Sequence, residues 1–201
     1  MSDAAAGPGS DPRANLDPSL EAEVLRTERL ELLPLPLEFC EAIVEGDRPS
    51  ARRVLGLDLG EWPTGSEVDR AFPFYAARLR EDPSMVAWQG RAIVVRESEE
   101  VAGSANFKGA PEDGLVEVGY QLVPRFRGNG YAREALLALV DRAFEEPEIE
   151  EVVAVIHPEN APSIAVAEAA GLQHIGERSE VHPASELWAI TRDEYESDAA
   201  G

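Results

Sequence analysis

The sequence predicts an α+β protein with a mixed, mostly antiparallel sheet and helices on both faces of that sheet. Three observations carry this prediction. Residues 115–123 alternate apolar with polar or small side chains, which is typical of a strand with one buried face. Residues 132–143 repeat apolar side chains at helical spacing. Residues 152–156 form a continuous apolar run, as in a strand that is covered on both faces.

The other elements follow from periodicity and from turn signals. A polar segment at residues 97–100 separates two strand-like runs, so these runs are predicted to pair antiparallel. In chain order we expect a strand near residues 24–33, helices near 36–45, 50–57 and 67–80, strands near 85–96 and 101–108, the unit described above, a short helix after residue 160, and strands near 174–181 and 186–191.

The segment 124–135 joins the alternating strand to the amphipathic helix, and it is the most informative part of the chain. Gly128 and Gly130 have no Cβ atoms at the point where the backbone turns. The helix that follows brings its positive end and its free N–H groups to the same place. These features predict a site for a diphosphate that is bound by main-chain groups.

Two other nucleotide-binding motifs do not fit this segment. The dinucleotide fingerprint requires a third glycine, but position 133 is an arginine. The phosphate loop requires Gly-Lys-Ser/Thr, but the only lysine of the chain is Lys108. A diphosphate without magnesium chemistry therefore remains as the predicted ligand.

The arrangement Arg125-x-x-Gly128-x-Gly130 resembles the acyl-CoA signature of the GNAT N-acetyltransferases. The residues around it are similar to the RimJ/RimL-like branch, which acetylates the N-termini of ribosomal proteins. A second segment agrees with that branch, since His157, Asn160 and Ser163 match its His-x-x-Asn-x-x-Ser spacing and Gly171 closes the motif. Leu172 departs from the phenylalanine that is usual after this glycine. The resemblance covers residues 24–193.

The resemblance implies a GNAT fold in which a parallel strand pair splays apart and admits the pantetheine arm of acetyl-CoA. It also implies direct transfer of the acetyl group to a primary amine, with acetyl-CoA as the cosubstrate. The residues expected to bind acetyl-CoA are Leu122, Val123, Arg125, Arg127, Gly128, Asn129, Gly130, Tyr131, Ala132, Asn160 and Ser163.

Two residues are candidates for proton transfer. Glu117 shares one strand face with Gln121, so its carboxylate is the candidate base, and a solvent-facing charge is the alternative interpretation. Ser163 is the candidate that protonates the departing thiolate, because some relatives use the serine at this position of the motif. Other branches use a tyrosine four residues later, which here is Ala167, so water remains an alternative proton donor. Asn160 fits both a helix N-cap and a ligand contact.

Composition limits the setting in which the protein works. The chain has 201 residues and a formal net charge of −21, which disfavours nonspecific binding to nucleic acid. No apolar run is long enough to span a membrane, so we expect a cytoplasmic protein. The protein is expected to be either a monomer or a homodimer. The three histidines lack the close spacing of metal ligands, so no metal is expected. We predict a disordered lead-in at residues 1–22, an acetyltransferase domain at 23–194 and a flexible tail at 195–201.

The amine acceptor is not identified by the sequence. The acceptor pocket is expected to come from the helices between residues 50 and 80, where Trp62, Phe72, Phe74 and Tyr75 supply aromatic surface. Most of these four residues are expected to belong to the core. A ribosomal N-terminus, an amino acid, an antibiotic and a polyamine all remain open as acceptors. Two noncatalytic hypotheses also remain, which are an acyl-CoA-binding module and a purely structural interaction protein.

Overall fold

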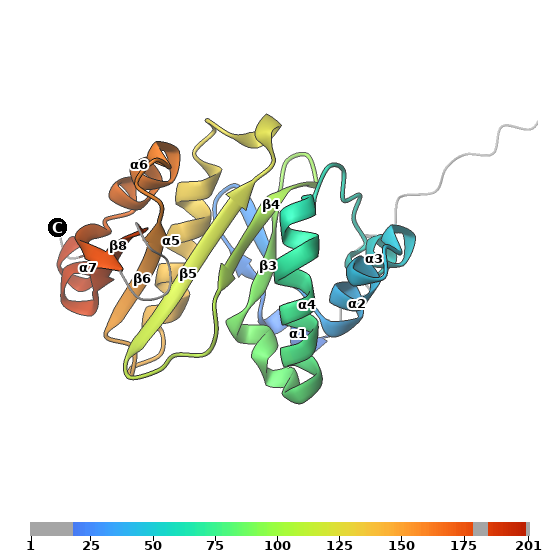
Figure 1. The fold of residues 1–201 in the computed structure, drawn as a ribbon, viewed down its shortest axis with the longest axis horizontal. Coiled ribbons are helices and arrows are strands. Elements are labelled where there is room, and N and C mark those ends of the chain that lie inside the picture. Colours follow the sequence, from blue (N-terminus) through green and yellow to red (C-terminus); the bar gives the residue numbers. More distant parts are fainter. Residues whose placement is uncertain (1–17, 179–184, 200–201) are drawn as a thin grey trace, which may run out of the picture.

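The computed structural model describes residues 18–178 and 185–199. This part of the chain forms an 8-stranded sheet in the order β1-β2-β3-β4-β5-β6-β8-β7 (Figure 1). Neighbouring strands are antiparallel except β5 and β6, which are parallel. The strands are β1 (Leu25–Arg26), β2 (Leu30–Pro34), β3 (Gly90–Val95), β4 (Glu100–Phe107), β5 (Leu115–Leu122), β6 (Glu151–Ile156), β7 (Gln173–Arg178) and β8 (Ser185–Thr191).

Helices cover both faces of the sheet, as the sequence predicted. In Figure 1, α4 crosses in front of β3 and β4, whereas α5 lies behind β5. Contacts join α2 to both α3 and α4, and α5 to β5 and β4. The helices are α1 (Pro18–Ala22), α2 (Leu37–Val44), α3 (Arg48–Leu55), α4 (Gly65–Glu81), α5 (Tyr131–Phe144), α6 (Ala161–Ala169) and α7 (Arg192–Ala199), with 3₁₀ helices at Pro83–Trp88 (η1) and Pro124–Phe126 (η2).

The parallel pair β5–β6 stays together for only half the length of β5. The residue pairs run from Leu115 with Glu151 to Val118 with Ala154. Beyond this point β5 continues to Leu122 and remains paired with β4 on its other side. The two parallel strands therefore diverge at residue 119, and this is the splayed pair that the resemblance implied.

A cluster of aromatic rings fills the core between α2, α4 and the segment that precedes α4. The rings of Phe39 and Trp62 stack with centroids 5.6 Å apart, and Phe72 lies 5.9 Å from each of them. Next to Phe39, Cys40 is fully buried. Burial raises the pKa of its thiol to about 12, so Cys40 stays protonated and fits a structural role rather than that of a nucleophile.

Two predicted strands differ from the observed ones. The run at residues 85–96 begins as η1 and becomes strand β3 only at Gly90. Asp82 explains this start, because its side chain accepts a hydrogen bond from Ser84 N at 2.9 Å, as a cap does. The run at residues 24–33 is divided into β1 and β2 by a turn in which Thr27 Oγ1 accepts from Leu30 N at 2.9 Å.

The ends of the chain also differ from the expected boundaries. The predicted lead-in at residues 1–22 overlaps α1, while residues 1–17 lie outside the described part. The predicted tail at residues 195–201 overlaps α7, which continues to Ala199. Tyr195 fastens α7 to the domain, because its ring lies 4.9 Å from that of Phe144 and its hydroxyl donates to Asp141 at 2.9 Å. The predicted strand at 174–181 begins as β7, and its residues 179–181 lie outside the described part.

None of the helices in residues 18–178 and 185–199 combines the length and the apolar character needed to cross a lipid bilayer.

Candidate active site

The glycine turn between η2 and α5 presents a row of unpaired main-chain donors. Gly128 and Gly130 adopt φ values of +78° and +80°. Residues with a Cβ atom rarely adopt such values. Arg127 N donates to Pro124 O at 3.2 Å, and Glu134 N donates to Gly130 O at 3.1 Å. Between these two bonds, the N–H groups of residues 128–133 have no acceptor in the described part of the chain. The turn therefore offers these N–H groups, together with the positive end of α5, to an anion.

A cavity of about 670 Å³ opens in front of these donors, between β5, the glycine turn and α6. We call it the glycine-turn cavity. It is lined by both glycines of the turn, by the start of α5 and by the first residues of α6. The lining residues are Tyr120, Gln121, Leu122, Arg127, Gly128, Gly130, Tyr131, Ala132, Arg133, Asn160, Pro162, Ser163 and Val166.

A second cavity, of about 220 Å³, lies where β5 and β6 separate. We call it the strand-gap cavity. Its walls come from Val118–Tyr120 on β5, from Ala154–Ile156 on β6, and from Lys108, His157, Asn160 and Ser163. Tyr120, Asn160 and Ser163 line both cavities, so the glycine-turn cavity adjoins the gap between the strands.

The main-chain groups of β5 alternate in direction, so two of its residues face the gap. Lys108 N donates to Glu117 O, which places the main-chain groups of Glu117 on the side of β4. Val123 N likewise donates to Ala102 O. Since successive residues point to opposite sides of a strand, the N–H and C=O groups of Tyr120 and Leu122 are directed toward β6, beyond the last β5–β6 pair.

The structure brings together most of the residues predicted to bind acetyl-CoA. Those that line the glycine-turn cavity are Leu122, Arg127, Gly128, Gly130, Tyr131, Ala132, Asn160 and Ser163.

Three of the residues predicted to bind acetyl-CoA do not line the glycine-turn cavity with their side chains. Arg125 Nη1 donates to Glu100 Oε1 at 2.6 Å, and its guanidinium lies 4.4 Å from the ring centre of Phe126. Val123 is buried, and its N–H belongs to the sheet. The Asn129 side chain donates to main-chain oxygens of the turn itself. These residues fit a role in shaping the turn.

The two candidates for proton transfer occupy different surroundings. Lys108 Nζ donates to Glu117 Oε1 at 2.5 Å, and Glu117 lines neither the glycine-turn cavity nor the strand-gap cavity. Ser163 lines both of them and lies in the first turn of α6. Asn160 caps this helix, since its Oδ1 accepts from Ser163 N at 3.3 Å, and it also lines both cavities.

Tyr120 stands at the junction of these cavities. Its hydroxyl donates to Ser163 O at 2.9 Å, which ties β5 to the start of α6. Burial raises the pKa of Tyr120 to about 12, so its phenol stays protonated at neutral pH. The sequence indicated Tyr120 only as an apolar position of the strand.

Positive charge collects at the glycine turn, although the chain is strongly acidic. Arg127 and Arg133 line the cavity and donate through Nε to Leu122 O at 3.1 Å and to Ala169 O at 2.6 Å. Neither arginine has an acidic partner in the described part of the chain. Their charges are therefore available to a phosphate.

A carboxylate that the sequence did not single out for function fastens the glycine turn to the edge of the sheet. Glu134 Oε1 accepts from Thr27 Oγ1 at 2.5 Å and from Arg29 N at 2.8 Å, and Arg29 Nε donates to Glu134 Oε2 at 2.7 Å. Arg29 Nη1 also donates to Asn129 O at 2.9 Å. Burial raises the pKa of Glu134, but the bonds from Thr27 and Arg29 outweigh it and leave this pKa below the ordinary value of 4.5.

Replacing Glu134 with glutamine is expected to lower the free energy of unfolding at pH 7 by about 1 kcal/mol, because the amide turns a donor toward Arg29. A lowered carboxylate pKa stabilises the fold above pH 4.5, and this stabilisation is lost as the pH falls through the folded-state value. In urea titrations, the difference between wild type and variant should shrink as the pH falls below 4.5. A difference that stays constant with pH would contradict this account.

A third cavity, of about 280 Å³, lies between α4 and strands β4 and β5. We call it the α4 cavity. It meets the glycine-turn cavity at Tyr120 and Gln121, which line both. Its other walls are Leu35, Ser66, Glu67, Arg70, Ala71, Phe72, Tyr75, Ser104 and Asn106. Of the aromatic residues expected near the acceptor pocket, Phe72 and Tyr75 are in this lining.

Glu67 is the buried carboxylate of this cavity, and its oxygen atoms are well supplied with donors. Oε1 accepts from Trp62 Nε1 at 3.0 Å and from Ser104 Oγ at 2.5 Å. Oε2 accepts from Thr64 N at 2.9 Å, from Thr64 Oγ1 at 2.8 Å and from Gln121 Nε2 at 3.3 Å. Glu67 therefore joins the start of α4 to β4 and β5. The sequence did not single out Glu67, although its Thr-x-x-Glu spacing from Thr64 is that of a capping box.

The family model described as "Acetyltransferase (GNAT) domain" matches residues 29–173. The chain belongs to the GNAT acetyltransferase family. This GNAT protein is 29% identical over 157 residues to the uncharacterized N-acetyltransferase p20 of Bacillus licheniformis, a match that covers 77% of this chain and 84% of p20.

Solved structures share the fold of this GNAT protein. The ribosomal-protein-S5-alanine acetyltransferase from Vibrio fischeri superposes with a TM-score of 0.60 at 15% identity, over 85% of this chain and 97% of that one. Mycobacterium smegmatis RimJ, solved in complex with CoA-disulfide, gives a TM-score of 0.56 at 19% identity, over 86% and 89% of the two chains.

Family membership makes the chain an acyltransferase, and acetyl-CoA is the cosubstrate of the GNAT family. The glycine-turn cavity and the strand-gap cavity adjoin each other, and the α4 cavity meets them at Tyr120, which lines all three. Such an arrangement has room for a cosubstrate on one side of Tyr120 and for an acceptor on the other. Within residues 18–178 and 185–199, no group of three or more His, Cys, Asp or Glu side chains is placed to hold a metal ion.

Proposed function

We propose that this enzyme transfers the acetyl group of acetyl-CoA directly to a primary amine. One observation carries the proposal: the unpaired N–H groups of residues 128–133 lie beside the point where β5 and β6 diverge. The N–H groups suit the diphosphate of acetyl-CoA, since a helix start with free donors favours anions. The gap between the strands suits its pantetheine arm, because the unpaired main-chain groups of Tyr120 and Leu122 bind the amides of the arm as a neighbouring strand would.

In this proposal the thioester lies near residues 119–122. The carbonyl oxygen gains negative charge when the amine attacks, and a main-chain N–H of β5 stabilises that charge. The amine must be neutral to attack. A peptide α-amino group, with a pKa of about 7.7 to 8.0, reaches that state more readily than a lysine side chain with a pKa of about 10.4. The site therefore needs only modest help from a base when the acceptor is an α-amine.

Ser163 is the better supported of the two candidates for proton transfer. It lines both the cavity at the turn and the cavity in the strand gap, so its hydroxyl is near the path of the arm. In the collapse of the tetrahedral intermediate the C–S bond breaks, and Ser163 gives its hydroxyl proton to the thiolate sulfur. Ser163 regains a proton from water, and the attacking nitrogen loses its proton to Glu117 or to water. Glu117 remains the candidate base through water, and its carboxylate forms an ion pair with Lys108.

Replacing Ser163 with alanine is expected to lower kcat about a hundredfold, because general acid catalysis contributes about this much. The dissociation constant of acetyl-CoA should stay close to that of wild type, since the main-chain donors remain. Steady-state kinetics with a peptide amine and calorimetric titration of acetyl-CoA test the two parts separately. An unchanged kcat would show that water protonates the thiolate.

The acceptor class that we propose first is a protein N-terminal α-amine, and a small-molecule amine is the second. The support is the fold shared with ribosomal-protein acetyltransferases and the residues around the glycine turn that resemble their branch. The test is acetyl transfer to ribosomal N-terminal peptides compared with small amines. A protein that binds acetyl-CoA but acetylates no amine would favour the noncatalytic acyl-CoA-binding module.

A further inference from the structure

Arg70 differs from the other arginines of the described structure. Its guanidinium makes no hydrogen bond, ion pair or ring contact within residues 18–178 and 185–199, whereas every other arginine whose side chain is described has at least one such partner. The chain carries 39 acidic and 18 basic residues, so an arginine side chain without any partner is unusual here. Arg70 is exposed and lines the α4 cavity.

The charge that this cavity offers to a ligand is positive. Glu67 is the one acidic side chain among the described residues that line it. Both oxygen atoms of Glu67 already accept from at least two donors each, so a cationic ligand would have to displace bonds that hold α4 to the sheet. Ser66, Ser104 and Asn106 supply neutral polar groups. The guanidinium of Arg70 is therefore the group of this cavity that can form an ion pair with an anionic ligand.

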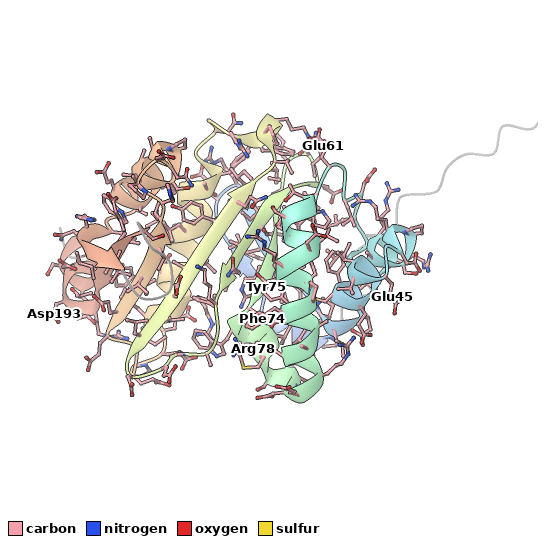
Figure 2. All side chains as sticks on the ribbon, viewed as in Figure 1. Glu45, Glu61, Phe74, Tyr75, Arg78 and Asp193 are labelled. Atoms are coloured by element: carbon pink, nitrogen blue, oxygen red, sulfur yellow. The ribbon has the colours of Figure 1, made fainter. Side chains whose placement is uncertain are left out.

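An exposed ring continues this surface along α4. Phe74 lies one helical turn after Arg70, on the same side of the helix, and its side chain is 49% exposed. Figure 2 shows Phe74, Tyr75 and Arg78 along α4. Arg78 packs over the Phe74 ring at 5.2 Å, which holds the ring in place. A ligand that reaches Arg70 therefore finds an apolar surface next to the charge.

We propose that the acceptor amine of this enzyme carries a carboxylate, which Arg70 binds while the amine lies at the junction of the cavities near Tyr120. Guanidinium and carboxylate form paired, charge-assisted hydrogen bonds, which give both affinity and orientation. The inference rests on the proposed acetyl transfer and adds to it the chemical class of the acceptor. A free amino acid and a peptide with an acidic residue near its N-terminus both present this chemistry.

The test measures kcat/KM for the neutral amine in two matched pairs of acceptors. Phenylalanine is compared with phenylalaninamide, and C-terminally amidated Phe-Asp with amidated Phe-Asn. The α-amino residue is phenylalanine in all four acceptors, so each comparison reports on the carboxylate. The first pair represents free amino acids and the second represents peptides. Wild type should prefer the carboxylate member of at least one pair by about tenfold to a hundredfold.

Three variants test whether the preference for the carboxylate acceptors depends on Arg70. Arg70→Gln should remove it while the amide acceptors react as in wild type, and Arg70→Lys should keep part of it. Arg53→Gln is the matched control, because Arg53 is also exposed, lies on α3 and donates to Ser50 Oγ at 2.7 Å, so the net charge changes equally. Arg53→Gln should keep the full preference. Circular dichroism and acetyl-CoA titration check that each variant is folded.

Equal rates within both pairs, or a preference that Arg70→Gln leaves intact, would overturn the assignment to Arg70. Acetyl-CoA binding without acetylation of any of the four amines would overturn it too. Acetylation of the amides alone would overturn the carboxylate inference and leave the proposed acetyl transfer standing. Failure to bind acetyl-CoA would instead overturn the proposed function itself.

Discussion

Replacing Gly128 with valine is expected to weaken acetyl-CoA binding by about a hundredfold, the loss expected when two or more hydrogen bonds to a charged group are disturbed. A Cβ built on Gly128 meets no protein atom within 4 Å, so the core does not resist it. The side chain instead occupies space in front of the N–H groups of residues 128–133, where the diphosphate is proposed to lie. Calorimetric titration of the variant with acetyl-CoA measures the loss.

Gly46→Val provides a matched control for backbone strain. Gly46 has a φ of +75°, close to the +78° of Gly128, and a Cβ there also meets nothing within 4 Å. Both substitutions therefore impose the same left-handed backbone on a valine, at a cost of about 1 to 3 kcal/mol. Gly46 lies between α2 and α3, away from the three cavities. Equal acetyl-CoA affinity in the two variants would contradict the assignment of the diphosphate site to the glycine turn.

Replacing Trp62 with alanine is expected to lower the free energy of unfolding by about 3 to 5 kcal/mol, a large share of the stability of a single domain. Trp62 is fully buried and stacks on Phe39. The truncation leaves a cavity between Phe39 and Phe72, and it removes the indole N–H that donates to Glu67 Oε1. Urea unfolding followed by circular dichroism measures the effect.

Phe74→Ala is the comparison for Trp62→Ala. Both residues are aromatic and belong to the same region, but Phe74 is 49% exposed. Its truncation should change the free energy of unfolding by less than about 1 kcal/mol, as is usual for surface substitutions. If Trp62→Ala were no more destabilising than Phe74→Ala, the aromatic cluster would not be the core that the structure indicates.

The glycine turn and the short helix α6 were predictable because their signals are local. Gly128 and Gly130 mark positive φ values within one turn of the backbone, and Asn160 caps a helix through a residue three positions later. Each of these features depends on neighbours in sequence. The strand, turn, helix and strand unit around them was therefore predicted in the right order.

Contacts between distant segments were not predictable from the same signals. Arg125 matches an acyl-CoA signature, yet it pairs with Glu100, which is 25 residues away. In the sequence, Glu134 is a polar residue of an amphipathic helix. Its partners in the structure, Thr27 and Arg29, are 107 and 105 residues away. The direction of a long polar side chain is set by the partner that tertiary packing brings near it. The spacing of apolar and polar residues along the sequence does not identify that partner.

The central claim is that the glycine turn and the gap between β5 and β6 together bind acetyl-CoA. Calorimetric titration of the purified protein with acetyl-CoA, with NAD as the control ligand, tests it most directly. Both ligands contain a diphosphate, but only acetyl-CoA has a pantetheine arm that fits the gap. We expect saturable binding of acetyl-CoA with a dissociation constant at least about tenfold below that of NAD. Equal binding of the two ligands, or no binding of acetyl-CoA, would contradict the claim.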